Sequence, residues 1–265
     1  MGAKLNGQVN GGEGALCSEG GPGHRPDVRP IVRPVVSGGD RYGTHRSVDP
    51  RGALPQPAWR LDNDFSRLFE GEVLVAVETL NVDAASFAQM EGAARQVDPD
   101  VGVGIAHIVL RTVGERGKQH NPATGSGGML LGRVLQVARA DSPLHVGDRV
   151  ATLASLSLTP LRVDRVRDIR RSSAQIDVDG EAVVFASSPC ARLPADLPER
   201  VALAALDVAG AAPLVARIAR PGGLVVVLGG GGKSGVLCAA EARRRVGPTG
   251  RVVGVESSAA AVEEA

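Results

Sequence analysis

A glycine-rich stretch near the C-terminal end carries the clearest chemical pattern in this sequence. It reads Gly-Gly-Gly-Gly-Lys-Ser-Gly, and Gly230, Gly232 and Gly235 fit the spacing G-x-G-x-x-G. The apolar run Leu-Val-Val-Val-Leu precedes it, as a buried strand would. A helix starting near Lys233 and Ser234 would point its free N–H groups and positive dipole end at a bound anion. The stretch therefore predicts a site for the pyrophosphate of a dinucleotide.

An acidic residue after the next apolar strand supports the same interpretation. The strand 251–256 follows a helix-length interval and ends on Glu256, where a ribose hydroxyl needs an acceptor. This acid favours NAD over its 2′-phosphorylated form. A phosphate loop of a nucleotide hydrolase is the competing interpretation of Gly232-Lys233-Ser234. That motif requires a glycine five positions before Gly232, where the sequence has Val227, so the spacing excludes it.

Composition excludes several classes of partner. The chain of 265 residues has 30 basic and 29 acidic side chains, and its net charge is +1. One Trp, one Tyr and four Phe leave little aromatic surface for base stacking. We therefore expect neither nucleic acid nor a membrane as a partner. The N-terminus has no compact apolar signal segment, so the cytoplasm is the expected compartment.

The pattern of apolar residues divides the chain into three parts. Residues 1–39 are rich in glycine and proline and are expected to be disordered. Residues 40–195 are expected to form a small barrel-like β-domain with few helices, because apolar and polar residues alternate in several short runs. A short helix is expected within 81–91. The predicted strands are 72–80, 132–138, 149–156 and 181–185, the last after an Asp179-Gly180 hairpin turn.

Helical periodicity begins in the third part, residues 196–265. Asp196 is the expected cap of a first helix, in which Val201, Ala204, Ala205 and Val208 line one face. A second helix, 214–219, leads into the strand 224–228, which is expected to be buried on both faces. An open dinucleotide-binding sheet normally has six strands. Only two are predicted here, and we therefore expect the chain to be cut short inside its second domain.

Several unusual strings resemble a known enzyme family. The β-rich part, the helical link, Val146-Gly-Asp-Arg-Val150 and the glycine-rich unit together resemble the medium-chain dehydrogenase/reductase superfamily. More narrowly, six strings are similar to the L-erythro-3,5-diaminohexanoate dehydrogenase family. They are 42–46, 54–64, 115–122, 124–130, 155–160 and 204–210. The resemblance implies an α/β chain: a GroES-like β-rich catalytic domain followed by an incomplete Rossmann domain, a doubly wound parallel sheet.

The resemblance also implies an activity and an assembly. The expected reaction is NAD-dependent oxidative deamination of L-erythro-3,5-diaminohexanoate to 5-amino-3-oxohexanoate, with release of ammonia, in lysine fermentation. The expected partners are a small amino-acid substrate and further copies of the chain, since many superfamily members are homo-oligomers. Two alternatives stay open: a zinc-free quinone or enoyl reductase of the same superfamily, and an inactive truncated fragment.

No zinc is expected, because the positions that hold it in zinc-dependent members differ here. The corresponding places are Asn81-Val-Asp83 and Gly127-Gly-Met-Leu130, which offer neither a thiolate nor an imidazole. Side chains must then accept the proton of the substrate amine. His120 or Lys118, in the polar cluster Glu115, Lys118, His120 and Asn121, is the candidate base, and a solvated loop is the alternative.

Other polar residues are candidates for substrate contacts. Asp83 would bind a substrate ammonium or cap the following helix, and capping is the simpler interpretation. Arg46, with His45 and Tyr42, would meet the substrate carboxylate, because a guanidinium can bind it through two hydrogen bonds; a surface arginine is the alternative. Asp207 stands out in an apolar helix, where it faces either a cleft or solvent.

Overall fold

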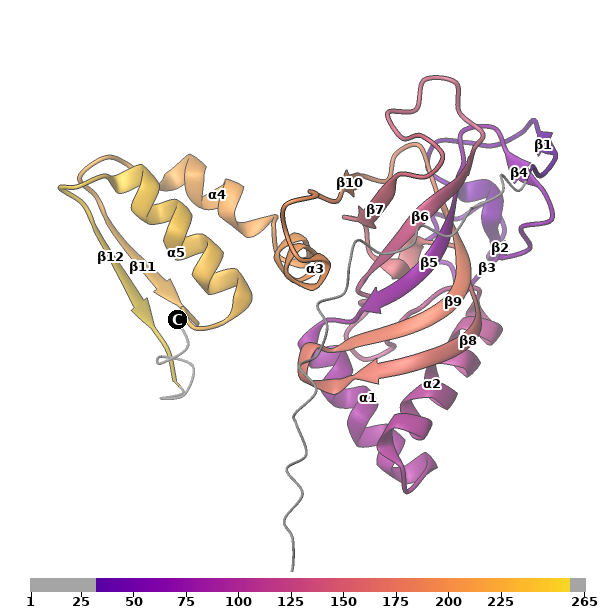
Figure 1. Ribbon diagram of the computed structural model, residues 1–265, viewed down its shortest axis with the longest axis horizontal. Coiled ribbons are helices and arrows are strands. Elements are labelled where there is room, and N and C mark those ends of the chain that lie inside the picture. Colours follow the sequence, from indigo (N-terminus) through magenta and orange to yellow (C-terminus); the bar gives the residue numbers. More distant parts are fainter. Residues whose placement is uncertain (1–31, 258–265) are drawn as a thin grey trace, which may run out of the picture.

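The computed structural model describes residues 32–257, so the disorder expected for residues 1–31 lies outside the described part. Within 32–39 the chain is ordered instead, because Arg33 pairs with Glu181 and Val35–Val36 form a strand. Figure 1 shows a larger β-rich unit and a smaller C-terminal unit, with one helix between them. The fold is α/β, with the β-rich unit first and a strand–loop–helix–strand unit second, as the sequence predicts. No single described helix is long and apolar enough to cross a membrane; one pair, bent by 56°, passes that test on length and composition together.

A six-stranded antiparallel sheet forms the centre of the β-rich unit. Its strand order is β10-β7-β6-β5-β9-β8. The central strand β5 pairs with β6 on one side and with β9 on the other. The strands are β5 (Val73–Asn81), β6 (Met129–Val137), β7 (Arg149–Thr152), β8 (Leu161–Arg170), β9 (Gln175–Val184) and β10 (Cys190–Arg192). Short outer pairs join β1 (Val35–Val36) to β4 (Leu68–Phe69) and β2 (Ser47–Asp49) to β3 (Arg60–Leu61).

Two helices pack together beside this sheet (Figure 1). They are α1 (Ala84–Val97) and α2 (Val101–Arg116), and their apolar side chains join those of β5, β6 and β9 in one core. The pattern of residues predicts only a short helix in 81–91, and this prediction of the helical content is wrong. Both helices are rich in alanine and glycine, which weakens their periodicity. A methyl group at Gly104 would lie 2.6 Å from the Ala94 carbonyl oxygen, so glycine permits their close contact.

Two predicted features of the sheet, the Asp179-Gly180 turn and the strand 149–156, differ in the structure. Asp179 and Gly180 do not form a turn, because β9 runs through them. A side chain at Gly180 would meet the Arg162 carbonyl oxygen at 2.2 Å, so this glycine serves a close approach between strands. The turn lies at Arg171–Ser173, before Ala174 with φ of 53°. The predicted strand 149–156 ends at Thr152.

The smaller unit has the predicted order of elements. After α3 (Glu199–Asp207) and α4 (Ala211–Ile218), β11 (Leu224–Leu228) and β12 (Arg251–Val255) pair in parallel. Helix α5 (Lys233–Val246) connects these two strands.

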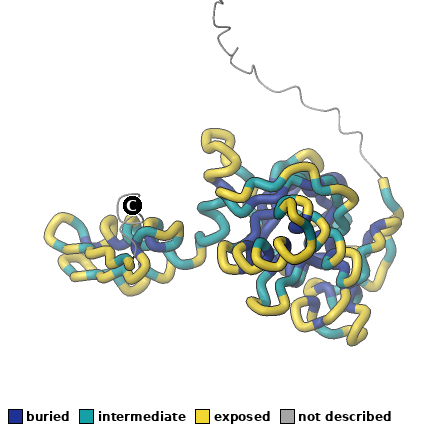
Figure 2. The backbone as a smooth tube through the Cα atoms, turned by 90° about the horizontal axis from the view of Figure 1, so that it is seen from below, coloured by how far each residue is buried: buried dark blue, intermediate teal, exposed yellow. Residues whose placement is uncertain are grey.

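Burial in this unit differs from the expectation. Asp196 makes no cap, because α3 begins at Glu199 after Pro198. The buried residues of α3 are Ala202 and Leu203, whereas Val201 is exposed. Strand β11 is also not buried on both faces. Figure 2 shows buried residues concentrated in the β-rich unit, and every second residue of β11 is exposed.

Candidate functional site

The C-terminal end of β5 brings several polar side chains together. Asn81, the last residue of this strand, is fully buried. Its Oδ1 accepts a hydrogen bond from Gln175 Nε2 at 3.2 Å, while its Nδ2 makes no hydrogen bond of normal geometry. Burying an amide N–H without such a bond costs free energy. A hydrogen-bond acceptor placed next to Nδ2 would therefore be favourable.

Asp83 follows this strand and caps α1. Its Oδ1 accepts a hydrogen bond from the Ser86 backbone N–H at 2.8 Å, and Oδ2 is buried without a hydrogen-bond partner. Burial alone would raise the pKa of Asp83, but hydrogen bonds from Ser86 and Ser126 lower it below its ordinary value. Asp83 is therefore a carboxylate at neutral pH, with one oxygen held by the helix.

A loop that carries His120 packs against the same helix start. Thr124 Oγ1 lies 2.6 Å from Ser86 Oγ, and Gly128, with φ of 76°, places its backbone against Asn81. His120 Nδ1 is buried without a hydrogen-bond partner. Burial lowers the pKa of His120 below its ordinary value, as do the charges of Arg116 and Lys118. His120 is therefore neutral at neutral pH and able to accept a proton.

Lys118 has a different environment from His120. It is fully buried, and its Nζ donates to the carbonyl oxygens of Pro55 at 2.7 Å and Gln56 at 2.9 Å. Burial, together with the charge of Arg116, lowers the pKa of Lys118 to about 8. Both hydrogen bonds hold the amine at the 55–56 turn, and this favours a structural role over that of a base.

Helix α3 brings Asp207 to the end of β5. The side chain is 15% exposed, and its Oδ2 lies 3.7 Å from Lys233 Nζ at the start of α5. Burial raises the pKa of Asp207 above its ordinary value; Lys233 and the Asn81 side chain act against this rise, and the charge of Asp83 adds to it. Asp207 therefore faces Asn81, Asp83 and Lys233 rather than open solvent.

A cavity of about 270 Å³ lies between the sheet and α3, and Gln175, the hydrogen-bond partner of Asn81, is one of its lining residues. It is lined by Thr79 and Gln175 from the sheet and by Leu203 from α3. Arg170 and Arg200 also line it; Arg170 pairs with Asp177. The sheet and α3 thus line a polar cavity at this place.

The glycine loop after β11 has the close contacts that its motif requires. A methyl group at Gly235 would lie 2.2 Å from the Gly229 carbonyl oxygen, and one at Gly230 would lie 3.1 Å from Gly254 Cα. Helix α5 begins at Lys233, next to Ser234, so its first amides have no acceptor within the helix. The loop therefore leaves room for an anion at this helix start, and its residues fit a dinucleotide.

Glu256 lies at the end of β12, beside the same loop. Its Oε2 accepts a hydrogen bond from the Gly231 backbone N–H at 3.2 Å. Gly230, Gly231 and Glu256 line a cavity of about 430 Å³ together with apolar residues of α5 and β12. This is the side on which the sequence analysis places the ribose of the cofactor.

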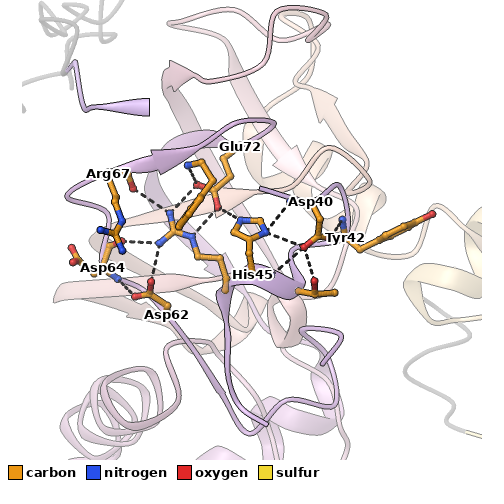
Figure 3. Close-up of polar contacts among 10 residues, drawn as sticks. Asp40, Tyr42, His45, Asp62, Asp64, Arg67 and Glu72 are labelled. Carbon is orange, nitrogen blue, oxygen red and sulfur yellow. Dashed lines mark hydrogen bonds and ion pairs between the residues drawn. The ribbon is translucent and has the colours of Figure 1, made fainter. Parts of the chain in front are cut away.

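The predicted carboxylate-binding residues lie in a separate, tightly paired cluster, shown in Figure 3. Arg46 is fully buried, and its Nε and Nη2 each donate to Glu72 at 2.8 Å. Its Nη1 donates to the Asp64 carbonyl oxygen at 2.8 Å. The guanidinium is thus already occupied, which argues for a structural role and against a contact with substrate.

His45 and Tyr42 belong to the surroundings of that cluster. His45 Nε2 lies 2.8 Å from Glu72 Oε1, and its Nδ1 lies 3.1 Å from Asp40 Oδ2. Burial alone would lower the pKa of His45, but the two carboxylates raise it above its ordinary value. Tyr42 is 55% exposed, and its ring points away from the cluster in Figure 3.

Sequence reasoning missed Asn81 and Gln175 as site residues. Asn81 appeared only as the place where a zinc ligand is absent, and Gln175 is distant in sequence. The signal was a polar residue that ends an apolar strand directly before the helix cap Asp83. Within residues 32–257, no group of three His, Cys, Asp or Glu side chains could hold a metal ion.

The fold consists of a β-rich unit followed by a strand–glycine loop–helix–strand unit, and sequence comparison gives the family. The family model for the L-erythro-3,5-diaminohexanoate dehydrogenase N-terminal domain matches residues 45–194. The chain belongs to this family. It is 49% identical over 220 residues to L-erythro-3,5-diaminohexanoate dehydrogenases of Acetoanaerobium sticklandii and Fusobacterium nucleatum. The match covers 82% of this chain and 62% of each relative, so the chain spans less than two thirds of their length.

Solved structures match this chain at lower similarity. AibC is 21% identical, with a TM-score of 0.40, over 73% of this chain and 51% of AibC. The quinone oxidoreductase of Thermus thermophilus, solved also with NADPH, is 19% identical, with a TM-score of 0.37, over 72% of this chain and 46% of that structure.

Proposed function

We propose that this chain is part of an NAD-dependent dehydrogenase that oxidatively deaminates L-erythro-3,5-diaminohexanoate to 5-amino-3-oxohexanoate and releases ammonia, a step in lysine fermentation. Family membership over residues 45–194 carries the proposal. The arrangement at the end of β5 supports it, because Asp83 and Asn81 supply a carboxylate and an amide donor there, and the loop that packs against the start of α1 carries the imidazole of His120.

The residues of the glycine loop fit a nicotinamide dinucleotide. Gly230 and Gly235 allow the tight packing of the loop against β12 and α5, Gly232 adds no side chain at the helix start, and the N–H groups at Lys233 and Ser234 are offered to the pyrophosphate. Glu256 is on the side of the ribose and favours NAD over its 2′-phosphorylated form. When bound, NAD supplies the acceptor for the hydride that leaves the substrate carbon.

His120 is the proposed base in this mechanism. The substrate ammonium must lose a proton before its carbon can give up hydride, and a neutral imidazole accepts that proton. The lowered pKa of His120 keeps the imidazole neutral at neutral pH. Water must then add to the imine carbon, and the un-hydrogen-bonded Nδ2 of Asn81 provides a donor for its oxygen.

The cavity lined by Gln175, the hydrogen-bond partner of Asn81, is the proposed place for the substrate carboxylate. Arg46 is occupied elsewhere, whereas Arg200 lines this cavity without an ion-pair partner among the described residues. A guanidinium binds a carboxylate through two parallel hydrogen bonds. Arg200 therefore replaces Arg46 as the proposed carboxylate contact. The cytoplasmic location, the homo-oligomer and the absence of zinc stay predictions.

Reaction stoichiometry tests the proposed function. The protein is incubated with NAD and L-erythro-3,5-diaminohexanoate, and NADH and ammonia are measured in the same samples. Equal amounts of both products are expected. NADH-dependent reduction of a quinone or an enoyl substrate without ammonia would instead indicate the reductase alternative, and no turnover of any of these substrates would indicate an inactive chain.

Replacement of His120 by alanine tests the base. Turnover should fall by about 10²-fold or more, the usual contribution of a positioned base. The matched control is His145→Ala, since this imidazole is exposed on the turn before β7. Unchanged turnover in His120→Ala would remove His120 from the mechanism.

A further inference from the structure

Asn81, Asp83, Asp207 and Lys233 form a group that we call the Asn81 corner. Asp83 lies after β5, Asp207 ends α3, and Lys233 begins α5, so three separate elements meet here. The group contains two carboxylates and one ammonium. One negative charge therefore lacks a counter-charge within the corner.

The free acceptor in this corner is well defined. Asp83 uses Oδ1 to cap α1, and its Oδ2 is buried without a hydrogen-bond partner. The hydrogen bonds of Asp83 come from Ser86 and Ser126 on its own side, and a buried carboxylate oxygen without a well-aligned donor is costly. A donor with positive charge is the chemical group that would satisfy it.

Asn81 lies next to the second carboxylate, that of Asp207. It is fully buried, and its NH₂ group lies beside Asp207 without a hydrogen bond of normal geometry. Lys233 Nζ is 3.7 Å from Asp207 Oδ2, a distance that leaves the ion pair loose. Burial still raises the pKa of Asp207, and Lys233 therefore does not compensate for its desolvation.

We propose that the Asn81 corner binds the second ammonium group of the substrate, the one that does not react, between Asp83 and Asp207. The proposal rests on the proposed function. It makes these two residues specificity-determining residues, which select 3,5-diamino acids over 3-amino acids. An amino acid with a single amine would leave the buried Asp83 oxygen unsatisfied, and sites of this kind reject such analogues strongly.

Calorimetric titration tests this proposal without requiring turnover. The ligands are L-erythro-3,5-diaminohexanoate and 3-aminohexanoate, each titrated into the protein with NAD present. The unmodified protein should bind the diamino acid about tenfold or more tightly than the monoamino acid. Asp207→Asn and Asp83→Asn should each remove most of this preference, with little change in the affinity for 3-aminohexanoate.

The choice of asparagine keeps the fold intact. Asparagine caps a helix about as well as aspartate, so Asp83→Asn should retain the start of α1. Asp100→Asn is the matched control, because Asp100 caps α2 through Gly102 and Val103 and is not part of the corner. Its preference for the diamino acid should equal that of the unmodified protein.

The possible failures are distinguishable. If NADH and ammonia form in equal amounts but Asp207→Asn and Asp83→Asn keep the preference, the corner proposal is wrong and the proposed function stands. If both variants weaken the two ligands equally, the corner does not select the second amine, and the proposal is again overturned. If the unmodified protein binds neither ligand, both proposals fail.

Discussion

Strands β5 and β11 are both rich in valine and leucine, yet they differ sharply in burial. In β5, Leu74 and Leu80 are fully buried between neighbouring strands and packed elements. In β11, Leu224 is 66% exposed and Leu228 is 79% exposed. An apolar run thus predicts a strand, but the number of partners around it decides its burial. Stability is therefore concentrated in the β-rich unit, whereas the glycine loop belongs to the unit with little core.

The largest expected effect is the loss of the buried ion pair in the β-rich unit. Glu72→Gln leaves the buried Arg46 guanidinium with only the partly exposed Asp62 as a counter-charge, and the free energy of unfolding should fall by about 3 kcal/mol. Urea denaturation measures this change. The matched control is Glu241→Gln in α5, whose partners Arg244 and Arg245 are solvent-exposed; a comparable loss there would contradict the contrast between the units.

Leucine truncation compares the two strands directly. Leu74→Ala in β5 should lower the free energy of unfolding by about 2–5 kcal/mol, because it opens a cavity in a packed core. Leu228→Ala in β11 should change it by less than about 0.5 kcal/mol, since the side chain is already exposed. Equal losses in the two variants, measured by denaturant unfolding, would show that β11 is covered in solution.

Two glycine variants show whether NAD binding depends on the shape of the glycine loop. Gly235→Ala places a methyl group 2.2 Å from the Gly229 carbonyl oxygen, so the loop must shift and NAD affinity should fall about tenfold or more. Gly232→Ala has its nearest neighbour at 3.9 Å, and the loop should keep its shape. Calorimetry with NAD measures both affinities, and thermal unfolding reports the fold. Unchanged NAD affinity in Gly235→Ala would contradict the proposed cofactor site.

A smaller effect is expected from the cap of α1. Asp83→Ala removes the acceptor for the Ser86 backbone N–H and should cost about 1 kcal/mol of stability. Asp83→Asn should cost much less, because the amide oxygen accepts the same hydrogen bond. Denaturant unfolding of Asp83→Ala and Asp83→Asn measures the contribution of the cap. The cap requires only an acceptor oxygen, which Asp83→Asn keeps, whereas the proposed ammonium contact requires the negative charge that both variants lack. Equal stability of Asp83→Ala and the unmodified protein would argue against the cap.

The smallest expected effect is a pH dependence from His45. Its pKa is raised in the folded protein, so its contribution to stability is fully present below the ordinary value of 6.5. This contribution is lost as the pH rises through the folded-state pKa. The measurement is the urea midpoint as a function of pH, and His45→Gln should lack this decrease. No histidine follows His145 in the sequence, so the smaller unit adds no such dependence.

Local features of the site could be predicted from the sequence, whereas features that depend on distant contacts could not. The loop around Gly235 was predictable, because a strand, three spaced glycines and a helix start lie within a short segment. Helices α1 and α2 were missed, because Gly104 looks like a helix breaker until Ala94 packs against it. Arg46 looked like a carboxylate ligand because its partner Glu72 is remote in sequence and its burial is a tertiary property.

The same reasoning applies to the Asn81 corner. Asp83 was recognised as a cap, since the cap and the helix it starts are neighbours in sequence. Asp207 could only be marked as unusual, because α3 must fold back onto the end of β5 before the two carboxylates meet. A polar residue at the end of an apolar strand, such as Asn81, is the signal that points to such a meeting.

Hydride transfer from the substrate carbon to NAD is the most direct test of the account. L-erythro-3,5-diaminohexanoate with deuterium at C3 is incubated with the protein and NAD, and the reduced cofactor is analysed by mass spectrometry together with ammonia. The account predicts one deuterium in the cofactor for each ammonia released. Ammonia without deuterium in the cofactor would contradict an oxidative deamination, and so would deuterated cofactor without ammonia.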